Sequence, residues 1–455
     1  MIDYFIRKIP SCDVSFEDFP YLKKYFSYII SEVIEVLNSK EIPPPKFAIR
    51  DTPYLESQFL ESDEDGVVVF DVSASLLLTK LTSVLLTGSV TREAWLSLLT
   101  TGVNSLIPLG YSHIGVSLAL NRSWDMMDSL SNIGRDSDSL CDLSNEFWGE
   151  HGRLSANIRC QEMFILTHEL THYFVTKDVY NLKSVSRTIY DDLIKNRSGD
   201  ISTTAFFAKV FGHMKPGDDE NQEFYKRARK EFFSPSFREE MLCDLNAAEI
   251  TIEYFTWDGD HMSHEEVCSS IQVVMRSLIL ATSLRNHLRI LTDTDGSREN
   301  KKRLDVQLFL RTKVLDAFLS KVIKNQSSFN AGKNKDEAVK RIVDYDVIHF
   351  ENLRKRTAAI ETCFFDDIIR IIGELEKVYP HIDRYISNTE TSALHYLGYN
   401  SIETEAEEFL RTDGSVFMRN EGLLDSLSKQ AKIDLYHISE ESIEKAQKLM
   451  QSTIW

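Results

Sequence analysis

The 455-residue sequence has no long apolar run, no close cysteine pair and no excess of positive charge. Its most hydrophobic stretch, residues 76–86, is interrupted by Lys80 and is too short to span a bilayer. The first residues lack the apolar core of a signal peptide. The six cysteines are scattered without a C-x-x-C pair, which argues against a disulfide framework and against a thiolate zinc site. These absences predict a cytoplasmic protein without membrane attachment.

Positive charge is in deficit, because 52 Lys and Arg residues stand against 70 Asp and Glu residues and give a formal net charge of -18. A surface of this sign repels phosphate backbones and anionic lipid, so we expect neither nucleic acid nor a membrane as a partner. Internal repeats and long low-complexity tracts are also missing, and the hydrophobic content of 42% is typical of globular proteins. A chain of this length is expected to form two or three domains.

Helical periodicity dominates what the sequence does contain, with one clear strand. Residues 66–72, GVVVFDV, are β-branched and aromatic and predict that strand. Apolar periodicity predicts helices over about 159–178 and 237–256. A further helix is expected to begin near Ser263, where S-H-E-E matches a capping box. We therefore predict an α+β fold that is predominantly helical, with a small sheet.

The run ILTHELTH at residues 165–172 places two histidines and a glutamate within an apolar helical pattern. On a helix, His168 and His172 stand about 6 Å apart along the axis and about 40° apart around it, so both imidazoles project toward one ion. Glu169 lies beside them in the sequence. Burying such groups without partners is costly, so the pattern favours a metal site over the alternative of hydrogen-bonded core histidines.

A second helix is expected to contain REEMLCDLNAAEITIEYF, which begins at Arg238. Its helical wheel places Glu240 and Asp244 within an apolar arc, and places Glu239 at the edge of the solvated face. The predicted solvated face consists of Asn246, Glu249 and Glu253. Carboxylates in an apolar arc normally become protonated or pair with a cation. That cation is a metal ion or, as the alternative, an arginine such as Arg238 or Arg276.

The spacing H-E-x-x-H resembles the metal-binding helix of the zincin metallopeptidases, and E-x-x-x-D at Glu240 and Asp244 is similar to the pattern of their gluzincin branch. The metzincin pattern does not fit, since Val175 and Asp178 occupy the positions of its glycine and third histidine. The resemblance implies a Zn²⁺ site with the ligands His168, His172 and Glu240. It also implies that Asp244 accepts a hydrogen bond from a ligating histidine, with Asp244 as the third ligand in the alternative geometry.

This resemblance implies a zinc-dependent endopeptidase for selected protein substrates, in which Glu169 is the general base toward a metal-activated water. A further residue is needed to stabilise the oxyanion. We favour His261, in the loop WDGDHMS, over His264 and Tyr254. The strand at residues 66–72 is a candidate edge strand for an extended peptide, with a core strand as the alternative.

The predicted organisation has three parts: an N-terminal helical region over 1–60, a zincin-like catalytic domain over 61–292 with an insertion at about 185–236, and a helical C-terminal domain over 293–455. The insertion is interpreted as a mobile lid over the site, with permanent core as its alternative. Two other functions stay open. One is an inactive zincin-fold binding or regulatory module whose C-terminal helical region recruits a protein partner, and the other is a zinc hydrolase of a non-peptide amide.

Overall fold

The computed structural model describes residues 12–13, 30–31, 33–35, 38–39, 45–51, 57–60, 66–71, 74, 78, 81–82, 150–177, 219–258, 262–291, 306–320, 322–323, 356, 359–360, 362–364, 366–367, 370 and 435–451. These residues are mostly helical and include one small sheet, which confirms the predicted α+β class at this coarse level. Among them, no helix combines the length and the apolar character that a membrane crossing requires.

The sheet has four strands in the order β1-β2-β4-β3. Their bounds are β1 Cys12–Asp13, β2 Lys46–Asp51, β3 Gln58–Leu60 and β4 Val67–Asp71. β4 pairs in parallel with β2 and antiparallel with β3, and all five of its residues are buried. The predicted strand is therefore confirmed, and of its two predicted positions the core position is right and the edge position is wrong, because β4 lies between two neighbours. Residues 1–60 contribute strands that the helical interpretation of this region missed.

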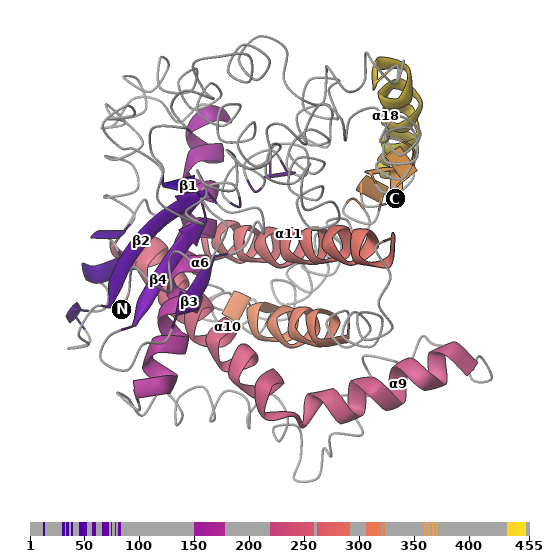
Figure 1. Ribbon diagram of the computed structural model, residues 1–455. Coiled ribbons are helices and arrows are strands. Elements are labelled where there is room, and N and C mark those ends of the chain that lie inside the picture. Colours follow the sequence, from indigo (N-terminus) through magenta and orange to yellow (C-terminus); the bar gives the residue numbers. More distant parts are fainter. Residues whose placement is uncertain are drawn as a thin grey trace, which may run out of the picture.

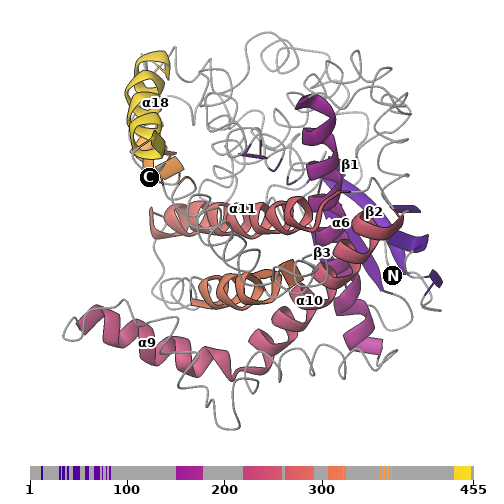
Figure 2. The ribbon, with the colours of Figure 1, turned by 180° about the vertical axis from the view of Figure 1, so that it is seen from behind.

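Helix α6, Glu150–Lys177, lies at the centre of the fold. It contacts β3 and β4 on one side, and it packs against α10 (Pro235–Glu253) and α11 (His264–Leu291) on the other. Opposite views show the sheet on one flank of α6 and α11 extending away from it on the other (Figure 1, Figure 2). α6 carries the HELTH residues, so this arrangement places the motif between the sheet and the helical layer.

Local capping signals set the starts of the two following helices. Ser234 caps α10, because its hydroxyl accepts a hydrogen bond from the Phe237 N–H at 3.1 Å, and Pro235 follows in the first turn. α10 continues into the π-helix η1, Tyr254–Asp258. The capping box predicted for the next helix is confirmed, since Ser263 and Glu266 exchange backbone-to-side-chain hydrogen bonds at 2.9 and 3.2 Å.

Part of the predicted insertion belongs to the core. Helix α9, Asp219–Phe232, buries Ala228 and Phe232 completely. The ring of Phe224 packs edge-on against Phe309, with the ring centroids 5.4 Å apart. These contacts favour the permanent-core alternative for residues 219–236, where an apolar face is buried against the neighbouring helix, and the lid stays a prediction. The remainder of the predicted lid, residues 185–218, lies outside the described residues.

A helix over residues 306–320 joins the same core. Its buried side chains share one hydrophobic cluster with those of α6, α10 and α11; they include Val306, Leu310, Val314, Leu315 and Phe318. The domain boundary near residue 292 stays a prediction, but the chain beyond it contributes directly to the packing around α10. A last helix, α18 (Leu435–Gln451), contacts the helical residues near 366 through the pairs Ser442–Asp367 and Lys445–Asp366.

Candidate metal centre

Three predicted ligand residues, His168, His172 and Glu240, come together where α6 packs against α10. The two oxygens of Glu240 face the two rings: Oε2 lies 3.5 Å from Nε2 of His168, and Oε1 lies 3.6 Å from Nε2 of His172. One potential ligand atom from each residue lies within 4.8 Å of the other two. The histidine rings meet edge-on, with centroids 5.0 Å apart. The one-turn spacing therefore directs both Nε2 atoms toward one carboxylate.

This donor set fits a zinc ion in chemistry and spacing. Four ligands at about 2.0–2.1 Å around a tetrahedral zinc ion stand roughly 3.3 Å from one another. The Nε2 atoms of His168 and His172 lie 3.5 and 3.6 Å from Glu240, close to that value, but each distance ends on a different carboxylate oxygen. Two imidazoles and one carboxylate also leave the fourth position that a catalytic zinc site keeps for water or substrate.

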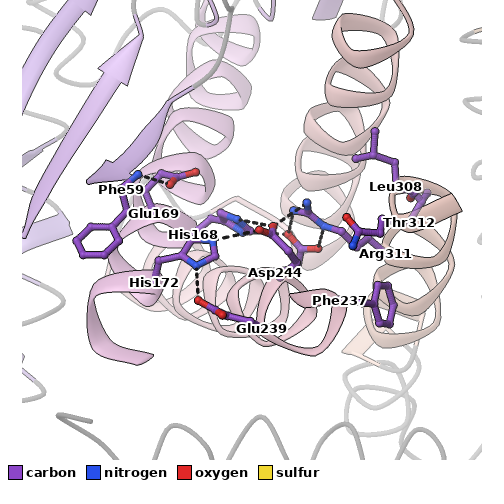
Figure 3. A network of polar contacts seen from close by, with 12 residues as sticks. Phe59, His168, Glu169, His172, Phe237, Glu239, Asp244, Leu308, Arg311 and Thr312 are labelled. Carbon is purple, nitrogen blue, oxygen red and sulfur yellow. Dashed lines mark hydrogen bonds and ion pairs between the residues drawn. The ribbon is translucent and has the colours of Figure 1, made fainter. Parts of the chain in front are cut away.

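A separate carboxylate lies against the Nδ1 atom of each histidine. Nδ1 of His168 lies 3.0 Å from Oδ1 of Asp244, and Nδ1 of His172 is hydrogen-bonded to Oε1 of Glu239 at 3.1 Å. Figure 3 shows both carboxylates reaching the rings from α10. Such partners fix the tautomer and the orientation of metal-binding histidines. Asp244 lies beside His168 as the gluzincin resemblance implies, but Nδ1 of His168 has no partner in hydrogen-bond geometry among the described residues. The hydrogen bond of this kind is made instead by Glu239 to His172, which the sequence did not reveal.

Arg311, on the helix over 306–320, contacts Asp244 from the side opposite His168 (Figure 3), and it also contacts Glu240. Its Nε and Nη2 atoms lie 2.7 and 2.8 Å from the two oxygens of Asp244. Its Nη1 atom lies 2.8 Å from Oε2 of Glu240. The alternative of an arginine partner is thus present, but the residue is neither Arg276, which is paired with Asp316, nor Arg238, which is exposed on the first turns of α10.

The charges of this network favour ionised carboxylates. Burial opposes ionisation of Glu240 and Asp244, but the Arg311 guanidinium and the His168 ring hold the pKa of each well below its usual range. Burial also disfavours a charged His168, yet Asp244 and Glu240 outweigh it and raise the pKa of His168 to about 10. Burial and the charge of His168 lower the pKa of His172. A metal ion at this site would therefore displace a proton from His168.

Glu169 is anchored to the sheet. Its Oε2 atom accepts a hydrogen bond from the backbone N–H of Phe59 in β3 at 2.7 Å (Figure 3). A backbone N–H on a carboxylate is a charge-assisted hydrogen bond and fixes the side chain strongly. The predicted general base thus lies between α6 and β3, and it follows His168 directly in the sequence.

A buried polar contact aligns the two motif helices. The Asn246 amide donates to the Thr171 hydroxyl at 2.8 Å, and that hydroxyl donates to the Thr167 carbonyl, also at 2.8 Å. Asn246 and Thr171 are both almost completely buried. Asn246 was predicted on the solvated face of α10, and this is wrong, because α6 covers that part of the helix.

The predicted oxyanion residue, His261, lies outside the described residues. Of its alternatives, His264 is the first residue of α11, where partial burial lowers its pKa. Tyr254 begins η1 and stacks edge-on with Phe255.

Comparison with protein-family models, curated proteins and solved structures gives no match to this chain. The interpretation of the site therefore depends on its two motifs and on the geometry described above.

Proposed function

We propose that this chain is a zinc-dependent endopeptidase that hydrolyses peptide bonds of selected protein substrates. The observation that supports the proposal is the convergence of His168 and His172 on the carboxylate of Glu240, with one potential ligand atom of each residue within 4.8 Å of the other two. The adjacent Glu169 supplies a carboxylate for proton transfer. Membership of the gluzincin branch is part of the same proposal.

Each residue has a distinct task in this proposal. His168, His172 and Glu240 hold the zinc ion, while Asp244 and Glu239 orient the two rings. A zinc ion held there would act as a Lewis acid, which would lower the pKa of a bound water to about 7 and polarise a carbonyl oxygen. Glu169 takes a proton from the attacking water and passes it to the leaving amine.

Metal analysis of the purified chain, followed by a cleavage assay on unfolded protein, tests this function. We expect about one zinc per chain, as a site of two histidines and one carboxylate requires. Glu169→Gln should keep the zinc and lose turnover, whereas His168→Ala and His172→Ala should lose both. Metal content near zero after gentle purification, with no affinity on adding Zn²⁺ back, would contradict the enzymatic function.

A second candidate is a metal-free binding or regulatory module. The observation in its favour is that Arg311 already provides a cation for Glu240 and Asp244. Buried carboxylates with such a partner need no metal to be stable. A chain that folds without zinc, and is not stabilised when Zn²⁺ is added, would favour this module over the peptidase.

A further inference from the structure

Arg311 contacts the predicted metal ligand Glu240. It comes from the helix over 306–320, which is outside both motif helices. Its three nitrogen contacts, two to Asp244 and one to Glu240, use the planar fork of the guanidinium. Only 11% of the Arg311 side chain is exposed. A fixed, buried fork of this kind determines where the carboxylate oxygens lie, and not only their charge.

The contact with Glu240 distinguishes its two oxygens. Oε2 lies 2.8 Å from Nη1 of Arg311 and 3.5 Å from Nε2 of His168, while Oε1 lies 3.6 Å from Nε2 of His172. Asp244 is held in the same way, because Arg311 contacts both of its oxygens and Oδ1 also lies against Nδ1 of His168. Arg311 thus orients the predicted ligand Glu240 and also Asp244, the carboxylate that lies beside the predicted ligand His168.

We propose that Arg311 is a positioning residue of the metal centre. It holds Oε2 of Glu240 so that this carboxylate binds the ion through Oε1 alone, and it locks Asp244 against His168. This inference rests on the proposed zinc site. It adds a residue to that site from a helix that neither sequence motif includes.

Two effects of Arg311 on metal affinity have opposite signs, and this makes the proposal testable. The positive charge of Arg311 repels a metal cation. If charge were the only effect of Arg311, its removal would therefore tighten metal binding. Its orientation of Glu240 and Asp244 favours binding, and loss of such outer partners typically weakens metal affinity about 10–100-fold. We expect orientation to dominate, because the fork contacts both carboxylates directly.

The test measures the affinity of the full chain for Zn²⁺ alone, by competition with a chelator. The variants are Arg311→Met, which removes charge and fork, and Arg311→Lys, which keeps the charge and loses the fork. Arg276→Met is the matched control, because Arg276 is similarly buried, with 12% of its side chain exposed, and pairs with Asp316 instead of the site. We expect about a 10–100-fold loss of affinity in both Arg311 variants and no change in the control.

Cobalt provides a readout that altered stability alone would not change. In the Co²⁺-loaded Arg311→Lys protein, visible absorption should weaken, since a carboxylate released to bind through both oxygens raises the coordination number.

A metal-bound structure of the wild-type chain gives a check that needs no variant: Arg311 should remain on Oε2 of Glu240. Tighter Zn²⁺ binding by Arg311→Met, wild-type affinity in Arg311→Lys, or an Arg311 that leaves Glu240 when metal binds would each overturn the proposal. If the wild-type chain itself binds no Zn²⁺, both the proposed function and this role fail, whereas binding unaffected by the variants removes only the role.

Discussion

Glu239 and His172 are joined by a hydrogen bond of 3.1 Å between Oε1 and Nδ1, which leaves the Nε2 atom of the ring facing Glu240. The two neighbouring glutamates of α10 therefore contact opposite nitrogens of one imidazole. This division of roles follows from their positions on the helix, because Glu240 points toward both rings while Glu239 lies closer to solvent, with 44% of its side chain exposed.

The first prediction concerns these two glutamates. Glu240→Ala should abolish stoichiometric zinc binding, because it removes a ligand, whereas Glu239→Ala should weaken it about 10–100-fold while one ion per chain still binds at saturation. Zinc titration with a competing chelator measures both. Glu253→Ala, at an exposed glutamate of the same helix, is the control and should bind like the wild type. Loss of the ion in Glu239→Ala with retention in Glu240→Ala would exchange the two roles.

The second prediction concerns the buried contact between Asn246 and Thr171. Thr171→Val leaves the Asn246 amide buried without its acceptor, so it should lower the free energy of unfolding by about 1–3 kcal/mol. The double variant Thr171→Val, Asn246→Leu should cost less than the sum of the single changes, since no buried polar group then lacks its partner. Urea denaturation of all four proteins measures the coupling. Strict additivity would show that this hydrogen bond does not link the helices energetically.

Sequence patterns predicted the parts of the site that depend on a single helix. The spacing of His168 and His172 fixes their common direction once α6 forms, and the wheel of α10 placed Glu240 and Asp244 on the side that faces them. The same wheel failed for Asn246, since periodicity gives the direction of a side chain but not what packs against it. α10 is buried over most of its surface, so a polar residue there indicates a partner instead of solvent.

The remaining parts depend on segments far apart in the chain. Arg311 lies 67 positions beyond Asp244, and no local pattern connects the two. Strand β3 has only three residues, too few for an alternating pattern to be recognised, yet its Phe59 N–H holds Glu169. Tertiary packing decides both contacts, so a single sequence without helical or strand periodicity at these positions could not predict them.

The third prediction concerns Gly66, at the start of β4. A Cβ atom at this position would lie 2.5 Å from a ring carbon of Phe59 and 2.5 Å from a ring carbon of Tyr173, which follows His172 on α6. Gly66→Ala should therefore push these packed rings apart and lower the free energy of unfolding by about 1–3 kcal/mol. Adding Phe59→Leu should restore part of that loss by making room, as denaturant titrations would measure. A single alanine variant as stable as the wild type would mean that the rings adapt without cost.

The fourth prediction tests whether α9 is core or cover, using two adjacent phenylalanines. Phe232 is completely buried and packs against Phe237, with ring centroids 5.4 Å apart, whereas Phe233 is 45% exposed. Phe232→Ala should lower the free energy of unfolding by about 3–5 kcal/mol, because it leaves a cavity in the core. Phe233→Ala should change it by less than about 1 kcal/mol. Denaturant titration compares the two, and zinc-dependent cleavage of an unfolded substrate separates the interpretations. If α9 is a mobile cover, Phe232→Ala should speed cleavage and leave the stability unchanged. If α9 is part of the core, Phe232→Ala should lower the stability and give no gain in cleavage. The burial of Ala228 and Phe232 predicts the second outcome.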